Sequence, residues 1–179
     1  MNIPLPKLKA ILLYFCSNTD RRFLGKTKLM KLFYFLDFMH LKKYGTPITY
    51  DKYVHLEHGP IPSVIKNLVD SASNDLDNSL LSDTIMIEHC DGLGMQRITA
   101  THPFIVEDER YFSATEMEIM RSVCQRFGDK NTKFIKDAAH SEAPWRKTAM
   151  LEEIPFSLVV EDNDCRVTKE EIEALNDIL

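Results

Sequence analysis

The feature that most constrains the fold is residues 26–44, where apolar side chains recur at helical spacing on nearly every side. They cover one broad face and much of the opposite one: Leu29, Leu32, Phe33, Leu36, Met39 and Leu41, then Met30, Tyr34, Phe35 and Phe38. A helix that is apolar nearly all round is normally buried on several sides. Lys42 and Lys43 fall in its last turn, and Gly45 can terminate it. The stretch therefore predicts a central, buried helix.

The rest of the chain carries further helix signals and weaker strand signals. Helices are expected from Pro6 to Asn18, after Pro62, behind the capping box of Ser113 and Glu116 up to Gly128, from Thr132 to His140, and behind the capping box of Thr168 and Glu171. Strands are expected as a hairpin of residues 84–87 and 96–100 around a glycine turn, a short strand at 104–106, and an extended piece after Pro47. We expect an α+β fold, predominantly α-helical, with a central buried helix packed by about five other helices and a small antiparallel β-hairpin.

Length and composition indicate one soluble domain. The chain has 179 residues, and about 150 residues is a common domain size, so residues 1–179 are expected to form a single domain. Its N-terminus lacks a basic segment followed by a signal-length apolar run. The apolar-rich run 29–41 is too short to span a bilayer and is interrupted by Lys31, Asp37 and His40. We expect a cytoplasmic protein with no membrane partner.

The charge is unevenly distributed along the chain. Residues 1–60 carry ten Lys/Arg and four Asp/Glu, a balance of +6, and residues 61–179 carry twelve and twenty-three, a balance of −11. If the two parts occupy different faces, the surface potential is oriented and steers charged partners. If they interleave in space, the field averages out. The sequence leaves both interpretations open.

A phosphate-binding loop and a nucleic-acid surface are both disfavoured. Gly25-Lys26-Thr27 resembles the end of a phosphate-binding loop, but the glycine required five residues earlier is Asp20, whose carboxylate repels phosphate. The basic residues nearby show no recognition-helix pattern and are interpreted as a solvated edge around a buried helix: Arg21, Arg22, Lys26, Lys28 and Lys31. We therefore expect neither a nucleotide cofactor nor a nucleic-acid partner.

Metal-dependent and nucleophilic catalysis find little support in the sequence. His55 and His58 are three residues apart, whereas the histidines of a metalloprotease helix are four apart with a glutamate beside the first. Further ligands would have to come from distant histidines, namely His40, His89 or His140. The four cysteines have no CxxC spacing, and no serine lies in a glycine-flanked turn of the kind that exposes a nucleophile. The chain is interpreted as a non-enzyme with no catalytic residue, metal or cofactor.

Two features are candidates for contact with a partner protein. The His-Gly-Pro loop offers Glu57, His58, Pro60 and Ile61, and a rigid loop displays side chains at low ordering cost. The alternative is that its glycine and prolines merely turn the chain into the next helix. Trp145, the one tryptophan, supplies a large apolar area and one hydrogen-bond donor. It either fills the core or anchors a partner.

One set of residues occurs along the chain in a specific order and spacing: Lys28-Leu29, Lys31-Leu32, Tyr34 and Asp37, then Gly45, Ile48, Tyr53 and His58-Gly59-Pro60-Ile61, and finally the helix Ser113–Phe127 with His140 and Trp145. In these residues the chain resembles the Panacea domain family, the SocA-like antitoxin domain often described as a phage-associated protein. The likeness spans about Leu5 to Trp145. Residues 146–179 are expected to form a C-terminal extension with a terminal helix.

The resemblance implies an antitoxin that neutralises a co-encoded toxin by direct protein–protein binding. It implies no catalytic residues. One alternative is an adaptor that delivers a toxin or another client to an ATP-dependent protease. A second alternative, from a different class, is a metal-dependent or nucleic-acid-processing enzyme. The sequence names neither the toxin nor the surface that binds it.

Overall fold

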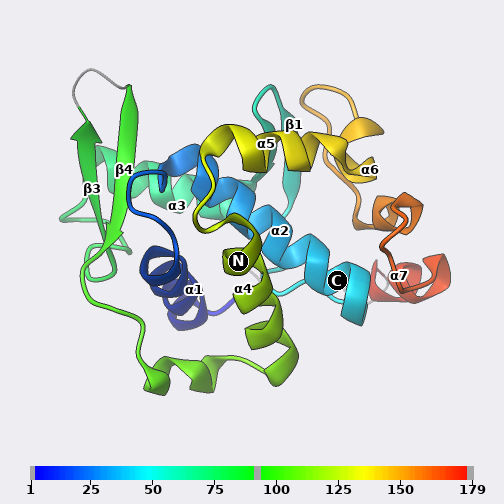
Figure 1. The fold of residues 1–179 in the computed structure, drawn as a ribbon, viewed down its shortest axis with the longest axis horizontal. Helices are drawn as coiled ribbons and strands as arrows, with labels where there is room; N and C mark the ends of the chain where they lie inside the picture. Colours follow the sequence, from blue (N-terminus) through cyan, green and yellow to red (C-terminus); the bar gives the residue numbers. More distant parts are fainter. Residues whose placement is uncertain (1–2, 91–93, 177–179) are drawn as a thin grey trace.

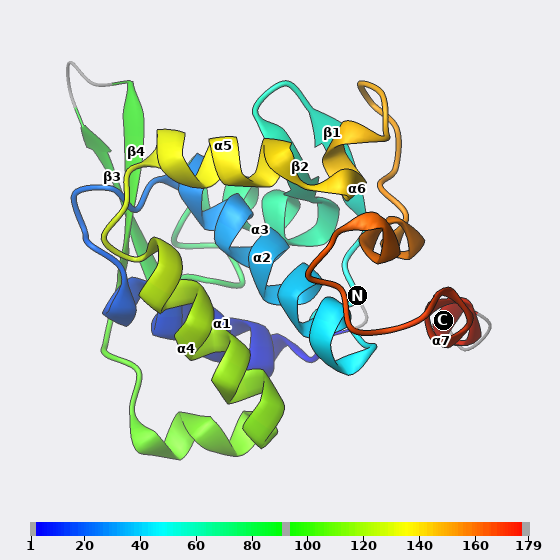
Figure 2. The same ribbon diagram turned by 45° about the vertical axis from the view of Figure 1, so that its right-hand side comes forward.

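The structure is a computed structural model that describes residues 3–90 and 94–176. Helix α2 (Lys26–Tyr44) runs through the middle of the molecule (Figures 1 and 2). The other helices are α1 (Leu5–Asn18), α3 (Ser63–Asn74), α4 (Ala114–Phe127), α5 (Thr132–Ser141), α6 (Ala143–Arg146) and α7 (Lys169–Asn176). Two 3-10 helices complete the set among the described residues, η1 (Val106–Tyr111) and η2 (Phe156–Glu161). The fold is α+β and dominated by helices, as predicted.

The central position of α2 follows from its side chains, which are buried along most of the helix. It packs against α3, α4, α5 and η2. Aromatic rings form much of the contact. The ring centroids of Phe35 and Phe127 of α4 lie 4.3 Å apart, and those of Phe38 and Tyr53 lie 5.1 Å apart. At its C-terminus, Gly45 adopts φ +80° and its N–H donates to the carbonyl of Leu41. The predicted buried helix and its glycine stop are both confirmed.

The predicted hairpin is also confirmed. Strands β3 (Ile85–Cys90) and β4 (Met95–Ala100) pair antiparallel, with Ile85 opposite Ala100 and Cys90 opposite Met95. Part of the predicted turn, residues 91–93, lies outside the described residues. The N–H of Ile98 donates to Leu24 at 2.9 Å, which fixes the hairpin beside the start of α2.

The prediction of a strand at residues 104–106 is wrong. Residues 104 and 105 are irregular, and Val106 begins η1. The segment is held on α1 rather than on a sheet, because the N–H of Phe104 donates to Ser17 Oγ and the Phe104 ring packs on Tyr14 at 5.1 Å. The carboxylate of Asp108 accepts a hydrogen bond from the N–H of Ile105 and stabilises the 3-10 turn. A local β-propensity is here overridden by tertiary contacts.

The basic and acidic parts of the chain interleave in space. Ion pairs join them at several places: Lys7 with Glu116, Lys9 with Asp83, Arg21 with Glu88, and Lys42 with Glu142, Asp162 and Asp164. Lys42 and Glu142 are buried, Asp164 is exposed, and the cluster ties the end of α2 to the segments around α6 and η2. Of the two interpretations of the charge asymmetry, the structure supports the interleaved one.

Within residues 3–90 and 94–176, no helix combines the length and the apolar character that a membrane crossing requires.

Candidate functional site

The His-Gly-Pro segment is a β-hairpin rather than the loop that the sequence suggested. Strands β1 (Tyr53–Leu56) and β2 (Gly59–Pro62) pair antiparallel, with Leu56 opposite Gly59. Glu57 and His58 form the two-residue turn at the tip. The prolines of β2 are tolerated because this strand lies at the edge of its sheet, where a missing N–H breaks no central ladder.

The hairpin divides the predicted partner-binding residues by exposure. Glu57 and His58 are exposed at the tip, Ile61 is half-buried and Pro60 is buried. In Figure 2 the hairpin stands beside α5 and α6. Direct contact with a partner is therefore most open to Glu57 and His58, while Pro60 belongs to the packing beneath them.

Gly59 is required by both its backbone and its surroundings. Its φ is +98°, in the left-handed region that glycine tolerates best. A Cβ at this position would lie 2.7 Å from Cε of Lys31 and 3.1 Å from Nε2 of His140. These two side chains come from α2 and α5, so the glycine is the place where three distant segments meet.

Lys31 attaches the hairpin to the central helix. Its side chain is fully buried, and its Nζ donates to the carbonyl oxygen of Pro60 at 2.7 Å. Burial, together with the positive charge of Lys136, lowers the pKa of this amine to about 7. The prediction that Lys28 and Lys31 form a solvated edge is wrong, because both side chains are buried. The Nζ of Lys28 donates to the carbonyl oxygens of Gly128 and Lys130, which follow the end of α4.

Trp145 supports the same hairpin through a stack of three rings. The ring centroids of His140 and Trp145 lie 3.8 Å apart and their planes make an angle of 8°. The ring centroids of His55 and Trp145 lie 4.5 Å apart, with 23° between the planes. Two rings at these distances cannot share one face, so the indole lies between them. Nδ1 of His55 is hydrogen-bonded to the hydroxyl of Thr148 at 3.0 Å. Trp145 is half-buried, and it joins α5 and α6 to β1.

A loop after α6 extends the sheet beyond β1. The N–H of Leu151 donates to the carbonyl of His55, the N–H of His55 donates to Glu152, and the N–H of Ile154 donates to Tyr53, at 2.9, 2.9 and 2.8 Å. The loop leaves Met150 exposed beside the hairpin tip together with Leu151. Sequence reasoning missed this pair, because no alternation or turn pattern marks residues 148–154 as a strand partner.

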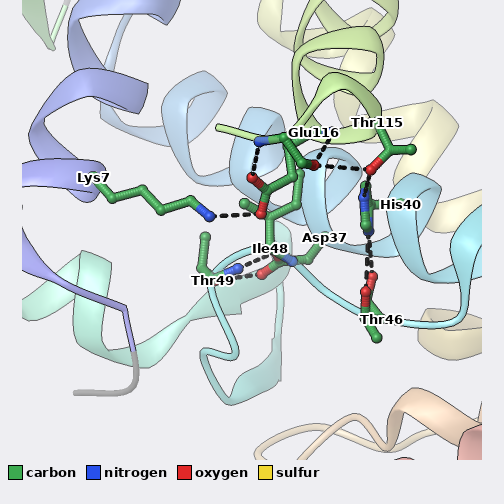
Figure 3. A network of polar contacts seen from close by, with 9 residues as sticks. Lys7, Asp37, His40, Thr46, Ile48, Thr49, Thr115 and Glu116 are labelled. Atoms are coloured by element: carbon green, nitrogen blue, oxygen red, sulfur yellow. Dashed lines mark hydrogen bonds and ion pairs between the residues drawn. The ribbon is translucent and has the colours of Figure 1, made fainter. Parts of the chain in front are cut away.

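The segment that leads into the hairpin is fixed by a buried carboxylate (Figure 3). Asp37 accepts hydrogen bonds from the N–H groups of Ile48 and Thr49 at 2.8 and 2.7 Å, and from Tyr53 Oη at 2.7 Å. Burial raises the pKa of Asp37 to about 6, against these hydrogen bonds, which lower it. One helical turn later, His40 contacts the Thr46 carbonyl on one side and Thr115 on the other.

The histidines considered as metal ligands are dispersed. His40 is bound to threonines, His55 and His140 stack on Trp145, and His58 lies at the exposed tip. In the part of the chain that the structure describes, no three His, Cys, Asp or Glu side chains are arranged to hold a metal ion. Gly25 caps α2, and no side-chain hydrogen bond caps this helix start.

Comparison with known proteins gives a family match. The model of the family described as antitoxin SocA-like, Panacea domain, matches residues 29–146. This range holds most of α2, both strands of the β1–β2 hairpin, α5 and Trp145. No curated protein and no solved structure matches the chain. The loop of Met150 and Leu151 begins where the matched range ends.

Proposed function

The chain belongs to the family of antitoxin SocA-like Panacea domains, and from this premise we propose that it neutralises a co-encoded toxin by binding that protein directly. The observation that carries the proposal is the family match itself, which covers residues 29–146. It includes Lys31, Gly59, His140 and Trp145, which together hold the β1–β2 hairpin in place.

The hairpin tip is the part of this region best built for contact. Glu57 and His58 are exposed, while the residues that flank them are fixed by the buried Lys31 and by the ring stack on Trp145. A preorganised surface loses little conformational entropy on association, so more of the contact energy appears as affinity. The tip offers one carboxylate and one imidazole, which suit a polar or positively charged patch on the toxin.

The proposed mechanism is stoichiometric: the toxin remains intact and its active surface is covered or distorted while the complex lasts. A protease adaptor would instead lower the amount of toxin. The two mechanisms therefore differ in a measurable quantity, the level of toxin in cells that also express this chain.

The test begins with the reading frames next to the gene. Each is expressed alone under an inducible promoter, and a frame that arrests growth is then expressed together with this chain. We expect growth to recover, the two proteins to purify together, and the toxin level to stay constant. Failure to rescue growth with every toxic neighbour would contradict the antitoxin function, and a toxin level that falls until a protease is removed would favour the adaptor.

A further inference from the structure

Leu151 has a backbone conformation that leucine rarely adopts. Its φ is +70°, in the left-handed region, where an L-residue other than glycine is disfavoured by about 1–2 kcal/mol. Tyr50, with φ +55°, has the same kind of conformation, but its ring packs against the core. Leu151 is 75% exposed, so burial does not offset its strain. Strained residues that fold stability does not explain cluster at functional sites.

The backbone around Leu151 is nevertheless well ordered by hydrogen bonds. The N–H of Leu151 donates to the carbonyl of His55, and the N–H of His55 donates to the carbonyl of Glu152, so the loop pairs with β1 at the strained position and at the residue after it. The Glu152 carboxylate also accepts the N–H of Ala149 at 2.7 Å and closes the turn. The loop thus holds an exposed leucine at a fixed place beside the hairpin tip. Met150, 52% exposed, precedes it.

The charged residues within the hairpin tip and within the loop have one sign. The hairpin tip, residues 56–58, and the loop, residues 149–153, contain Glu57, Glu152 and Glu153 and no lysine or arginine. Glu153 is paired with Lys52 at 3.5 Å. Among the described residues, Glu57 and Glu152 take part in no ion pair with another side chain. An apolar pair with unpaired carboxylates beside it is complementary to an apolar pocket with a basic rim.

We propose that Met150 and Leu151 insert into an apolar pocket on the toxin, that positively charged residues at its rim face Glu57 and Glu152, and that this loop determines which toxin the chain neutralises. This inference rests on the proposed antitoxin function. The match to the family ends at residue 146, so the supporting hairpin belongs to the shared domain, whereas the loop lies beyond it. A shared scaffold with a separate contact loop allows the partner to change without disturbing the core.

Leu151→Gly separates contact from stability. Glycine accepts φ +70° without strain, so the variant should unfold at the same temperature as the wild-type chain or slightly above it. If Leu151 had only a structural role, the Leu151→Gly variant would instead be less stable than the wild-type chain. Met150→Ala is the second variant, and Leu80→Ala, at a position 57% exposed in the turn region before β3, is the matched control.

The probe is the neighbouring gene product that wild-type chain neutralises, purified as an inactive variant, and its affinity is measured by calorimetry. We expect Leu151→Gly to weaken binding about thirtyfold, as removal of an interface hot spot does, and Leu80→Ala to leave it unchanged. Wild-type affinity should fall as salt rises. Binding by Leu151→Gly and Met150→Ala within about threefold of wild type would overturn this inference and leave the antitoxin function standing, while a wild-type chain that binds no toxic neighbour would overturn both.

Discussion

Gly59 and Lys31 are packed so closely that a methyl group on the glycine would lie 2.7 Å from Cε of the lysine. Relief of this overlap requires Lys31 to move, and we expect this movement to disturb its hydrogen bond to the carbonyl of Pro60. We therefore expect Gly59→Ala to lower the free energy of unfolding by about 2 kcal/mol, from overpacking and left-handed backbone strain together. Urea denaturation of the two proteins measures the difference.

Gly94 provides the control for this prediction. It also has a positive φ, +58°, but a Cβ there would meet no atom within 4 Å. Gly94→Ala should therefore cost less than about 1 kcal/mol, because backbone strain is partly offset by the reduced entropy of the unfolded chain. Equal losses of stability in the two variants would show that packing against Lys31 and His140 contributes nothing.

The buried amine of Lys31 should make stability depend on pH. Burial lowers its pKa to about 7 in the folded protein, whereas the ordinary value is 10.5. Between these values the unfolded chain binds more protons than the folded one, so this group makes the free energy of unfolding rise with pH. Lys31→Met should flatten the rise between about pH 7 and pH 9, a range below the titration of tyrosine.

The measurement is chemical denaturation of wild type and Lys31→Met across this pH range. Lys133→Met removes an exposed lysine of α5 and controls for the loss of one positive charge. Lys136 and His140 face Lys31 from α5, and both remain in either variant. Parallel stability curves for Lys31→Met and the wild-type chain would refute the assignment of the pH dependence to Lys31.

Local signals predicted the helices well, and their physical basis explains why. One end each of α2 and α4 depends on nearby residues: Gly45 adopts the left-handed conformation after α2, and Ser113 and Glu116 form the capping box of α4. These groups are visible in the sequence. Helix positions thus depend on chemistry within about four residues.

The β1–β2 hairpin was not predictable in the same way. Two prolines and a glycine in β2 indicate a loop when taken alone. Its strand geometry depends on Lys31, His140 and Trp145, which lie between about thirty and ninety residues away in the chain. For the same reason the sequence left two roles open for Trp145, whose histidine neighbours come from separate elements.

Asp37 should be the most sensitive polar residue of the central helix. Removal of its carboxylate by Asp37→Ala leaves the N–H groups of Ile48 and Thr49 and the hydroxyl of Thr49 without their acceptor in a buried region. Each such group costs about 1–3 kcal/mol, so we expect a loss of at least about 3 kcal/mol. Asp37→Asn keeps the shape and one acceptor oxygen, and thermal unfolding should place it between wild type and Asp37→Ala. A loss below about 1 kcal/mol for Asp37→Ala would be incompatible with this network.

The hairpin tip should contribute to toxin binding without contributing to stability. Glu57 and His58 are exposed and precede Gly59 in the turn, so Glu57→Ala with His58→Ala should change the free energy of unfolding by no more than about 0.5 kcal/mol. If the tip contacts the toxin, the double variant should bind it about tenfold more weakly, since polar contacts at an interface are commonly worth about 1 kcal/mol or more. Calorimetry with the purified toxin gives the affinity, and Lys133→Ala on α5 serves as a surface control. Wild-type affinity in the double variant, with toxin still neutralised in cells, would remove Glu57 and His58 from the interface.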